Sequence, residues 1–426
     1  MDIMKLVKEN EAYLIEMRRY FHRFPESSGK EEKTVERISQ ELTKMGVEHV
    51  VVPNGGILGF IDGPTPGKTV LLRADVDALP MQEDPNNLKG PKVAVSEVDG
   101  VCQSCGHDGH TAMLLVAAKI LNENKDQIKG RVIILFERGE EFAGNLLHIF
   151  KYMKDHNITA DSSWGAHLYA MLESGKVSLR PGPVMAGAVG FTITIKGRGG
   201  HGSRPDQSVS PIDCFVALYN GMNTIRMKKV SPFNSLTFSV GSLHSGAAGN
   251  IIPDSLEFSG TARIFEMEDG FAFRDTLVKM MKDIGDAYDC EVTGKITGPA
   301  LSVKNDPECA ALAKKVLGEA IGQEHLEDTD PWMASESMSM ILNMWPGVFA
   351  LIGIQNEEKG TGAPHHNGNF DLDEDVLAYG AAGAVAYALG FLNSDLDTSD
   401  RKWKDGFAAL YRYAGRPEEQ VKYLED

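Results

Sequence analysis

A dense group of reactive side chains lies in residues 101–110, which read VCQSCGHDGH. Cys102 and Cys105 are three positions apart, and His107, Asp108 and His110 follow at once. Thiolate and imidazole are good zinc ligands, and two ligands close together in a loop can face one metal ion. A Cys-x-x-Cys pair is also the pattern of redox-active thiols. These residues alone leave a catalytic metal site, a structural zinc site and a redox pair open.

Three further groups of potential ligands lie at the ends of strand-like runs or in loops. Glu140 and Glu141 come shortly after GRVIILFE, and His167 ends SSWGAH. His365 and His366 precede a predicted helix, in GAPHHNGNFDLDEDVL. In a metal site, one of two adjacent glutamates binds the ion while the other serves as general base. Four such groups in one chain favour a shared metal site over isolated polar residues.

The elements that must position these groups alternate between strands and helices. TVLLRADVDAL and GRVIILFE are short apolar runs typical of buried parallel strands, and GHTAMLLVAAKILNENK between them has helical periodicity. This order predicts an α/β fold with a mixed, mostly parallel sheet flanked by helices. Sites in such sheets form in loops at the strand ends, where the candidate ligands lie.

The pattern changes near residue 187. From there to residue 298 the order is strand, helix, strand, strand, helix, strand, which predicts an inserted ferredoxin-like α+β domain. The alternation of helices and strands resumes after it. The predicted large domain is therefore discontinuous and consists of residues 1–186 and 299–426. A hinge is expected near residues 181–187 and at Gly298.

Composition and charge restrict the classes of partner. The 43 basic and 60 acidic residues give a formal charge of −17, which argues against nucleic acid or an anionic membrane. The N-terminus predicts an amphipathic helix rather than a signal peptide, and we find no run of about 18 apolar residues. Five cysteines in 426 residues favour a reducing cytoplasm. The polar residues after Asn393 favour a solvated C-terminal helix over an oligomer contact.

Taken in order, the motifs carry a resemblance. The chain resembles the amidohydrolase branch of the di-metal exopeptidase superfamily, which includes hippurate hydrolases, indole-acetyl-amino acid hydrolases, N-acyl-amino-acid deacylases and, more distantly, carboxypeptidase G-type enzymes. The matching segments are LLRADVDALPMQE, CGHDGHTAMLL, the Glu-Glu pair, GAHLY, LRPGPVMAG, IKGRGGHGSRP, GNIIPD, GTAR, GIQNEEKG and HNGNFDLDEDVL. They span nearly the whole chain and occur in the order of the family.

The resemblance implies a role for each candidate metal-site residue. Cys105 would bridge two divalent ions, zinc or manganese, with cobalt or nickel as further candidates. The other implied ligands are His107 and His167 for one ion and Glu141 and His366 for the second. Glu140 would be the general base and Asp77 would orient a ligand. His366 is preferred over His365 because it precedes Phe370 by the family's four-residue step, and Asp75 is interpreted as structural rather than as an extra ligand.

The resemblance also implies roles for the inserted domain as a lid. His201 would donate to the reaction oxyanion in the active site of a partner subunit, and Asn250 and Arg263 would bind the polar end of the substrate. For Arg263 an exposed strand residue is an equally good interpretation. The implied assembly is a homodimer through the lid, with a tetramer as the alternative.

Several residues depart from the family pattern without removing a ligand or the base. Gln103 and Ser104 precede the ligand cysteine, where the family usually has His-Ala. Glu137-Arg138-Gly139 replaces Gln-Pro-Ala before the glutamate pair, and GSRP replaces Ala-Ala-x-Pro after His201. Ser337 stands where an aspartate is common. These changes bear on substrate preference. Arg138 and Arg204 are candidate cations for an acidic substrate, although surface charge is the simpler interpretation.

The sequence therefore predicts a metal-dependent amidohydrolase that cleaves N-acyl or N-aroyl amino acids. A metal ion lowers the pKa of a bound water from about 15.7 to roughly 7, and Glu140 would take the proton. A dipeptidase or carboxypeptidase with the same metal site is the alternative. A non-catalytic or redox protein with a Cys102–Cys105 disulfide is the third hypothesis.

Overall fold

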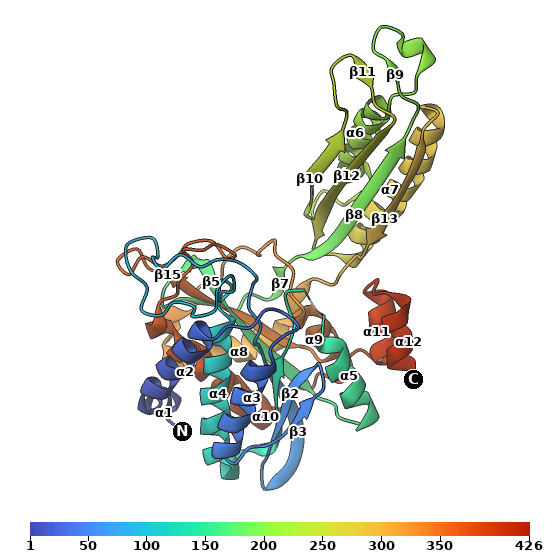
Figure 1. Cartoon of the computed structure of the whole chain (residues 1–426). Coiled ribbons are helices and arrows are strands. Elements are labelled where there is room, and N and C mark those ends of the chain that lie inside the picture. The colour runs from blue at the N-terminus through green and yellow to red at the C-terminus, as the bar shows by residue number, and fades with distance from the viewer. Residues whose placement is uncertain (143) are drawn as a thin grey trace.

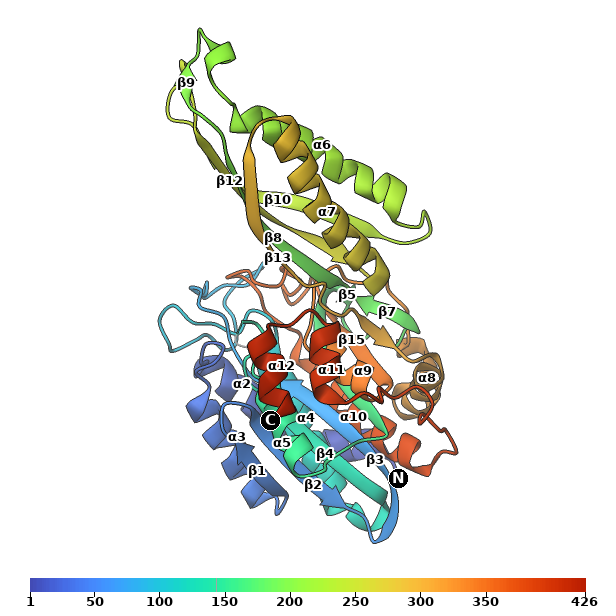
Figure 2. The same ribbon diagram turned by 90° about the vertical axis from the view of Figure 1, so that its right-hand side faces the viewer.

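The computed structural model describes residues 1–142 and 144–426 and shows two parts of different architecture (Figure 1). The larger part contains both chain ends. The smaller part, built from strands and helices between Gly187 and Thr297, extends away from it, as the view turned by 90° also shows (Figure 2). The expected combination of an α/β part with a separate antiparallel α+β part is confirmed.

The larger part is built on a seven-stranded sheet. In spatial order its strands are β1 (Glu48–Val52), β2 (Gly56–Asp62), β4 (Lys129–Glu137), β3 (Thr65–Asp75), β5 (Ser162–Glu173), β15 (Gly347–Gln355) and β6 (Val177–Ser178). The four strands β4, β3, β5 and β15 run parallel, and the pairs at both edges are antiparallel. The sheet is thus mixed, with a parallel centre.

Helices cover both faces of this sheet. The core on one face includes α1 (Ile3–Glu9), α2 (Glu11–Arg23), α3 (Glu32–Lys44), α4 (His107–Glu123), α8 (Pro307–Ile321) and α10 (Leu377–Asn393). The core on the other face includes α5 (Leu146–Asp155), α9 (Met338–Met344), α11 (Gly406–Tyr413) and α12 (Glu418–Glu425). Along β3, Val70 and Leu72 pack into the first core and Leu71 into the second. Because successive side chains of a strand point to opposite faces, a strand covered on both sides is apolar throughout.

The smaller part has the predicted ferredoxin-like order. Its elements are β8 (Gly187–Lys196), α6 (Pro211–Lys229), β10 (Leu236–Ser245), β12 (Ser255–Ile264), α7 (Met267–Ala287) and β13 (Glu291–Thr297). The sheet order is β10-β12-β8-β13, all antiparallel, and α6 and α7 pack on it. At the far tip β9 (Gly200–His201) pairs with β11 (Ile251–Ile252). The chain enters and leaves this part next to a ribbon of β7 (Gly182–Met185) and β14 (Val303–Asn305).

Four single turns of 3₁₀ helix complete the described elements. They are η1 (Lys125–Gln127), η2 (Pro205–Gln207), η3 (Gln323–His325) and η4 (Glu374–Val376). The segment Glu374–Asn393, formed by η4 and α10, is long and apolar enough to cross a membrane, which the sequence analysis did not recognise. Within its most apolar window 78% of residues are buried in the protein, as in a core helix.

The C-terminal residues do not form the solvated helix that the sequence favoured. They form α11 and α12, which contact α5 and α9. Leu410, Tyr411, Val421 and Leu424 are at most 3% exposed and belong to the second core. The expectation was wrong because the apolar residues of two short helices, separated by a turn, add up to one buried face that no single periodic stretch reveals.

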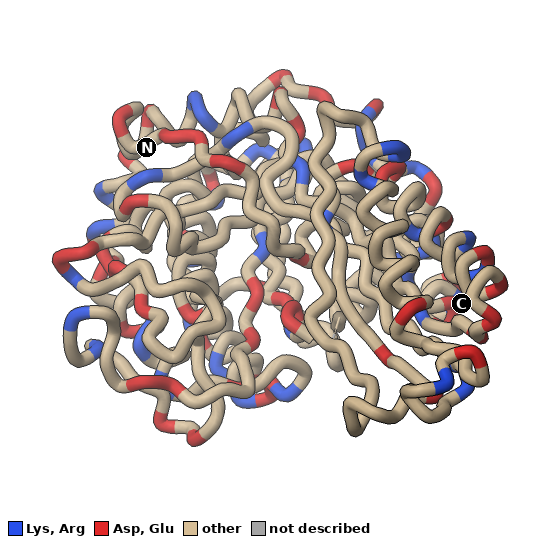
Figure 3. The backbone as a smooth tube through the Cα atoms, turned by 90° about the horizontal axis from the view of Figure 1, so that it is seen from above, with Lys and Arg blue, Asp and Glu red and all other residues tan. Residues whose placement is uncertain are grey.

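Charged residues of both signs are interspersed around the outline of the molecule (Figure 3). Acidic residues are more numerous, 60 against 43. Several charged groups lie in the interior, near the ends of the parallel strands, and these belong to the site described next.

Candidate metal centre

The candidate ligands gather where the parallel strands end. β3 ends at Asp75, two residues before Asp77, and β4 ends at Glu137, shortly before Glu140 and Glu141. Loops that follow neighbouring parallel strands meet at one edge of the sheet, which is why sites form there. The topology therefore brings together residues that are far apart in the sequence.

A glycine shapes the turn that carries the ligand cysteine. Gly106 adopts φ +94°, a left-handed conformation that favours glycine, and α4 begins at the next residue, His107. A Cβ atom on Gly106 would lie 3.3 Å from the Leu168 side chain, closer than ordinary contacts allow. The turn thus sits tightly against β5, the strand that carries His167.

The five predicted metal-binding residues form two groups that share one cysteine. Ligand atoms of Cys105, His107 and His167 lie within 4.8 Å of one another, and so do those of Cys105, Glu141 and His366. Cys105 Sγ lies 3.6 Å from His167 Nε2, and His366 Nε2 lies 3.1 Å from Glu141 Oε1. A thiol shared by two groups is the arrangement that a bridging ligand requires.

Asp77 contacts one member of each group. Its Oδ1 lies 3.0 Å from His107 Nδ1, and its Oδ2 accepts a hydrogen bond from the backbone N–H of Glu141 at 2.9 Å. A carboxylate behind a histidine sets the tautomer in which the other ring nitrogen is free to bind metal. Asp77 is therefore placed to orient a ligand on each side of the cluster.

Glu140 lies beside the ligands with one oxygen held and the other free. The backbone N–H of Ser337 donates to its Oε1 at 3.0 Å, whereas Oε2 has no hydrogen bond within the described residues. Burial raises the pKa of this carboxyl well above its ordinary value, and the nearby carboxylates of Glu336, Asp77 and Glu141 raise it further. A buried carboxyl that is fixed by one hydrogen bond and lies beside the candidate metal ligands (the metal cluster: Cys105, His107, Glu141, His167 and His366) is suited to act as a general base.

A buried arginine organises the carboxylates behind Glu140. Arg73 contacts Asp75 at 2.8 Å, Glu137 at 2.7 Å and Glu336 at 2.9 Å. Glu137 and Ser337, which both depart from the family pattern, are hydrogen-bond partners, since the hydroxyl of Ser337 donates to Glu137 at 2.7 Å. Burial raises the pKa of Glu137 to about 7. This network fixes the segment whose backbone N–H holds Glu140.

The donor set fits divalent metal ions. Among the described residues, His107 Nε2 is buried and has no hydrogen-bond partner, although buried polar atoms normally have one, and His366 Nε2 at 3.1 Å is the one ion-pair partner of the buried Glu141 Oε1. Both atoms point into the cluster that holds the Cys105 thiol and the His167 ring. Thiolate, imidazole and carboxylate together suit zinc and related transition metals.

Comparison with known proteins identifies the family. Residues 71–389 match the model of peptidase family M20/M25/M40. The chain belongs to this family. The expected resemblance to di-metal exopeptidases and amidohydrolases is thereby confirmed, and this M20-family protein is a metallo-hydrolase of amide or peptide bonds.

Relatives with different activities match most of the chain. Thermostable carboxypeptidase 2 of Saccharolobus solfataricus is 35% identical over 91% of this chain and 97% of its own. IAA-amino acid hydrolase ILR1-like 4 of Arabidopsis thaliana is 31% identical over 94% and 91%, and N-acetylcysteine deacetylase of Bacillus subtilis is 30% identical over 85% and 93%. The finer activity is thus not given by relatedness alone.

A solved structure agrees with the fold and with a two-metal site. The Bacillus subtilis YXEP protein, a dinuclear metal binding peptidase from the M20 family, matches with a TM-score of 0.73 and 26% identity over 90% of this chain and 99% of its own. The two-metal site is described for the YXEP protein, and its likeness to this chain supports the expected fold.

Three other polar residues near the candidate ligands, His110, Asp75 and His365, make hydrogen bonds or ion pairs with neighbouring residues. His110 uses both ring nitrogens, since Nδ1 lies 2.6 Å from Asp75 Oδ1 and Nε2 accepts the N–H of Leu168 at 2.9 Å. Asp75 is held by His110 and Arg73, which favours the structural interpretation. His365 accepts the N–H of Ala170, and burial lowers its pKa to about 3. The geometry therefore favours His366 over its neighbour.

The two cysteines of the Cys-x-x-Cys pattern have different surroundings. All five cysteines, each within the described residues, are free thiols. Cys102 is 1% exposed and forms a backbone bridge with Leu79, whereas Cys105 faces His167. The disulfide of the redox hypothesis is not formed in this structure.

The three lid residues do not come together. Arg263, on β12, lines a cavity with Glu140, Glu141 and His366. Its Nε donates to the carbonyl of Met333 at 2.9 Å and its Nη1 to Thr261 at 2.7 Å. His201 and Asn250 line a different cavity, beside β9 and β11 at the far tip of the lid (Figure 1). Within one chain they lie away from the metal cluster.

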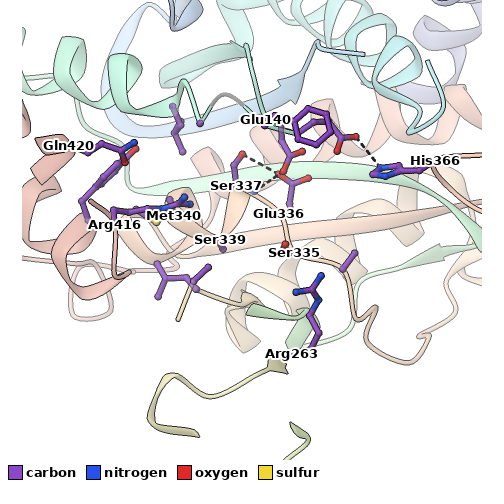
Figure 4. Close-up of a pocket in the computed structure, with 18 residues that line it drawn as sticks. Glu140, Arg263, Ser335, Glu336, Ser337, Ser339, Met340, His366, Arg416 and Gln420 are labelled. Atoms are coloured by element: carbon purple, nitrogen blue, oxygen red, sulfur yellow. Dashed lines mark hydrogen bonds and ion pairs between the residues drawn. The ribbon is translucent and has the colours of Figure 1, made fainter. Parts of the chain in front are cut away.

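The cavity at the metal cluster has a volume of about 450 Å³ and a wall that the sequence analysis missed (Figure 4). That wall includes Tyr411, Arg416 and Gln420 from α11, α12 and the turn between them. No motif marks these residues, which lie in a polar terminal stretch.

Arg138 and Arg204, the two candidate cations for an acidic substrate, form ion pairs with other residues. Arg138 is 7% exposed and contacts Glu31 at 2.8 Å and Glu32 at 3.1 Å. Arg204 is on the lid surface and pairs with Asp206 at 2.7 Å. Arg138 is therefore part of a buried ion pair and not the surface charge that the sequence favoured.

Proposed function

We propose that this protein hydrolyses the amide bond of N-acyl or N-aroyl amino acids, releasing a carboxylic acid and a free amino acid. The observation that carries the proposal is the cavity that places Arg263 with Glu140, Glu141 and His366. After its bonds to Met333 and Thr261, Arg263 keeps Nη2 without a partner within the described residues. A guanidinium is suited to the free carboxylate of an amino acid.

The chemistry divides between ligands and a base. Cys105, His107 and His167 would hold one ion, and Cys105, Glu141 and His366 would hold the other. Both ions would be zinc or manganese, with cobalt or nickel as further candidates. When bound, the ions supply a water of lowered pKa and polarise the substrate carbonyl. Glu140 takes a proton from the water on its free Oε2 while Ser337 holds Oε1, and it then delivers that proton to the leaving nitrogen.

The cavity suits a substrate whose acyl part carries no free α-amine better than a dipeptide, whose N-terminal α-amine is free. A dipeptide would need a carboxylate to accept its ammonium group. The three acids that line the cavity are already assigned: Glu140 as base, Glu141 as ligand, and Glu336 in its ion pair with Arg73. This favours N-acyl substrates over the dipeptidase alternative, although carboxypeptidase action on a blocked peptide uses the same groups.

A substrate panel tests the proposal. Purified protein supplied with zinc or manganese is assayed with N-acetyl, N-benzoyl and longer N-acyl amino acids, and with dipeptides and their N-acetyl analogues. We expect kcat/KM to be higher for each N-acetyl dipeptide than for the free dipeptide. The reverse order would favour the dipeptidase. A protein without two ions per chain after reconstitution under reducing conditions would contradict the metal mechanism.

The lid tip supports a proposed dimer. His201 and Asn250 lie far from their own metal cluster, so in a homodimer through the lid they would serve the site of the partner subunit. Sedimentation would measure the assembly, and a tetramer is the alternative outcome. Mixing a Glu140→Ala chain with a His201→Ala chain would then restore activity only if the two chains share a site.

A cytoplasmic location stays a prediction.

A further inference from the structure

The C-terminal arm, defined here as residues 394–426, forms one wall of the proposed substrate cavity. Leu410, Val421 and Leu424 anchor its helices in the second core. Tyr411 lies near the end of α11, Arg416 lies in the turn after it, and Gln420 lies in α12. All three side chains line the cavity. The arm is therefore fixed by buried apolar contacts while its polar side chains face the space next to the metal cluster.

These three side chains carry hydrogen-bond donors that no described residue accepts from. In the described part of the chain, the guanidinium of Arg416, the amide of Gln420 and the hydroxyl of Tyr411 make no hydrogen bond; the bonds found for Arg416 and Gln420 involve only their backbone N–H groups. Tyr411 is 3% exposed, whereas Gln420 is half-buried and Arg416 is exposed. What points to a ligand is that three unpaired donors line one cavity together with Glu140, Glu141 and His366.

The charge of Arg416 is also unbalanced. Arg412, near the end of the preceding helix α11, contacts Glu425 at 2.8 Å and Glu418 at 3.9 Å. Arg416 has no ion pair with any carboxylate among residues 1–142 and 144–426. An arginine left unpaired in a chain with 17 more acidic than basic residues faces the cavity instead (Figure 4).

The acids of the cavity do not neutralise Arg416. Glu336 is held by Arg73 at 2.9 Å, and Glu141 lies with His366 in the metal cluster. Figure 4 shows Arg416 and Gln420 on one side of the cavity, His366 on another and Arg263 below them. Two guanidinium groups thus enter one cavity from separate elements, the lid and the C-terminal arm.

We propose that Tyr411, Arg416 and Gln420 form an anion subsite for a second carboxylate of the substrate. This inference rests on the proposed function, in which Arg263 takes the α-carboxylate of the amino acid. The substrate would then be an N-acyl amino acid with two carboxylates. The second one is supplied either by the acyl chain, as in an N-succinyl amino acid, or by an acidic amino-acid side chain.

Matched substrates separate these two sources. N-succinyl-leucine differs from N-butanoyl-leucine only in carrying a carboxylate in place of a methyl group on the acyl chain. N-butanoyl-glutamate places the charge on the amino-acid side instead. We expect wild-type kcat/KM to be higher for one dicarboxylate than for N-butanoyl-leucine, and the preferred one identifies the side on which the arm lies.

Substitutions then assign the preference to the arm. In Arg416→Gln we expect the ratio of kcat/KM for the preferred dicarboxylate to that for N-butanoyl-leucine to fall about 10- to 100-fold, the range for one charge-assisted contact. Arg416→Lys should restore part of the ratio. Arg412→Gln, in the same C-terminal arm and outside the cavity, is the matched control and should keep the wild-type ratio. Equal unfolding temperatures of the two glutamine variants would show that the arm remains folded.

Failure of this inference is distinguishable from failure of the proposed function. If wild type hydrolyses all three substrates without preferring a dicarboxylate, or if Arg416→Gln keeps the wild-type ratio, the subsite is wrong and the amidohydrolase stands. If wild type hydrolyses none of them, the proposed function fails. The subsite is then decided by calorimetric binding of glutarate and butyrate: tighter binding of glutarate that is lost in Arg416→Gln supports it, and equal binding overturns it.

Discussion

Replacing Asp77 by asparagine removes one acceptor from between two proposed metal ligands, His107 and Glu141. Oδ1 lies 3.0 Å from His107 Nδ1, and Oδ2 accepts the N–H of Glu141 at 2.9 Å. When His107 binds a metal through Nε2, its proton is on Nδ1, so both partners of Asp77 are donors. Asparagine has a single acceptor oxygen, and one of the two hydrogen bonds is lost in either orientation of its amide.

Each orientation disturbs a different ligand. With its NH₂ group toward His107, asparagine favours the tautomer protonated on Nε2, which withdraws that nitrogen from the metal. The backbone carbonyl of Asp77, also 3.0 Å from Nδ1, opposes this change. With its NH₂ group toward Glu141, the buried N–H loses its acceptor, and the backbone that presents the Glu141 carboxylate must move.

The expected magnitude follows from the lost bond. A hydrogen bond to a charged group contributes about 1.5–3 kcal/mol. At about 1.4 kcal/mol for each factor of ten, this corresponds to metal binding weakened roughly 10- to 150-fold. Residues that orient metal-binding histidines have effects of about 10- to 100-fold, which agrees. We therefore expect at least one ion to bind about 10- to 100-fold more weakly in Asp77→Asn.

Competition with a chromophoric chelator measures this affinity without using activity. Zinc and manganese are each titrated into the metal-free protein, and activity is then measured at saturating metal, which should restore much of kcat. Asp62→Asn, at the exposed end of β2 where Asp62 pairs with Arg131, is a control on the same sheet and should leave both affinities unchanged. If Asp77→Asn binds both ions as tightly as the wild type, the role inferred for Asp77 is wrong.

Three further outcomes are expected. Glu140→Gln should keep two ions per chain but lose about 10²- to 10⁴-fold in kcat, and near wild-type activity would exclude it as the base. Chelation should lower the unfolding temperature, since an ion at 100 times its Kd stabilises the fold by about 2.7 kcal/mol per site; an unchanged temperature would contradict a built metal site. Cys102→Ser should keep full activity in reducing buffer because Cys102 belongs to none of the candidate ligand groups found among the described residues; a large loss would show that its assignment is wrong.

Local sequence signals were sufficient for the framework of the site. The apolar runs of β3 and β4 could be recognised because strands buried on both faces are apolar throughout. The ligands that follow them, such as Glu141, are then expected at one edge of the sheet from topology alone. His366 could be chosen over His365 only through the family motif, and the structure supports that choice with the bond from Ala170 to His365.

Other features required the tertiary structure because they depend on pairing between distant segments. Arg138 was a candidate for substrate binding by residue type, yet its contact with Glu31 commits it to the interior. Ser337 and Glu137 were separate departures in the sequence and are hydrogen-bond partners in the fold. Neither relation has a periodicity or spacing that a sequence pattern can express.

The sequence by itself determined the fold class and the family and provided the candidate metal ligands, because these depend on periodic burial and on motifs of reactive side chains. Only the tertiary structure decided which polar residues face the substrate. The C-terminal arm shows the reason: Arg416 reaches the cavity because apolar residues of α11 and α12 dock into a core formed mostly by much earlier segments. Such docking is a property of complementary surfaces, and no local pattern records it.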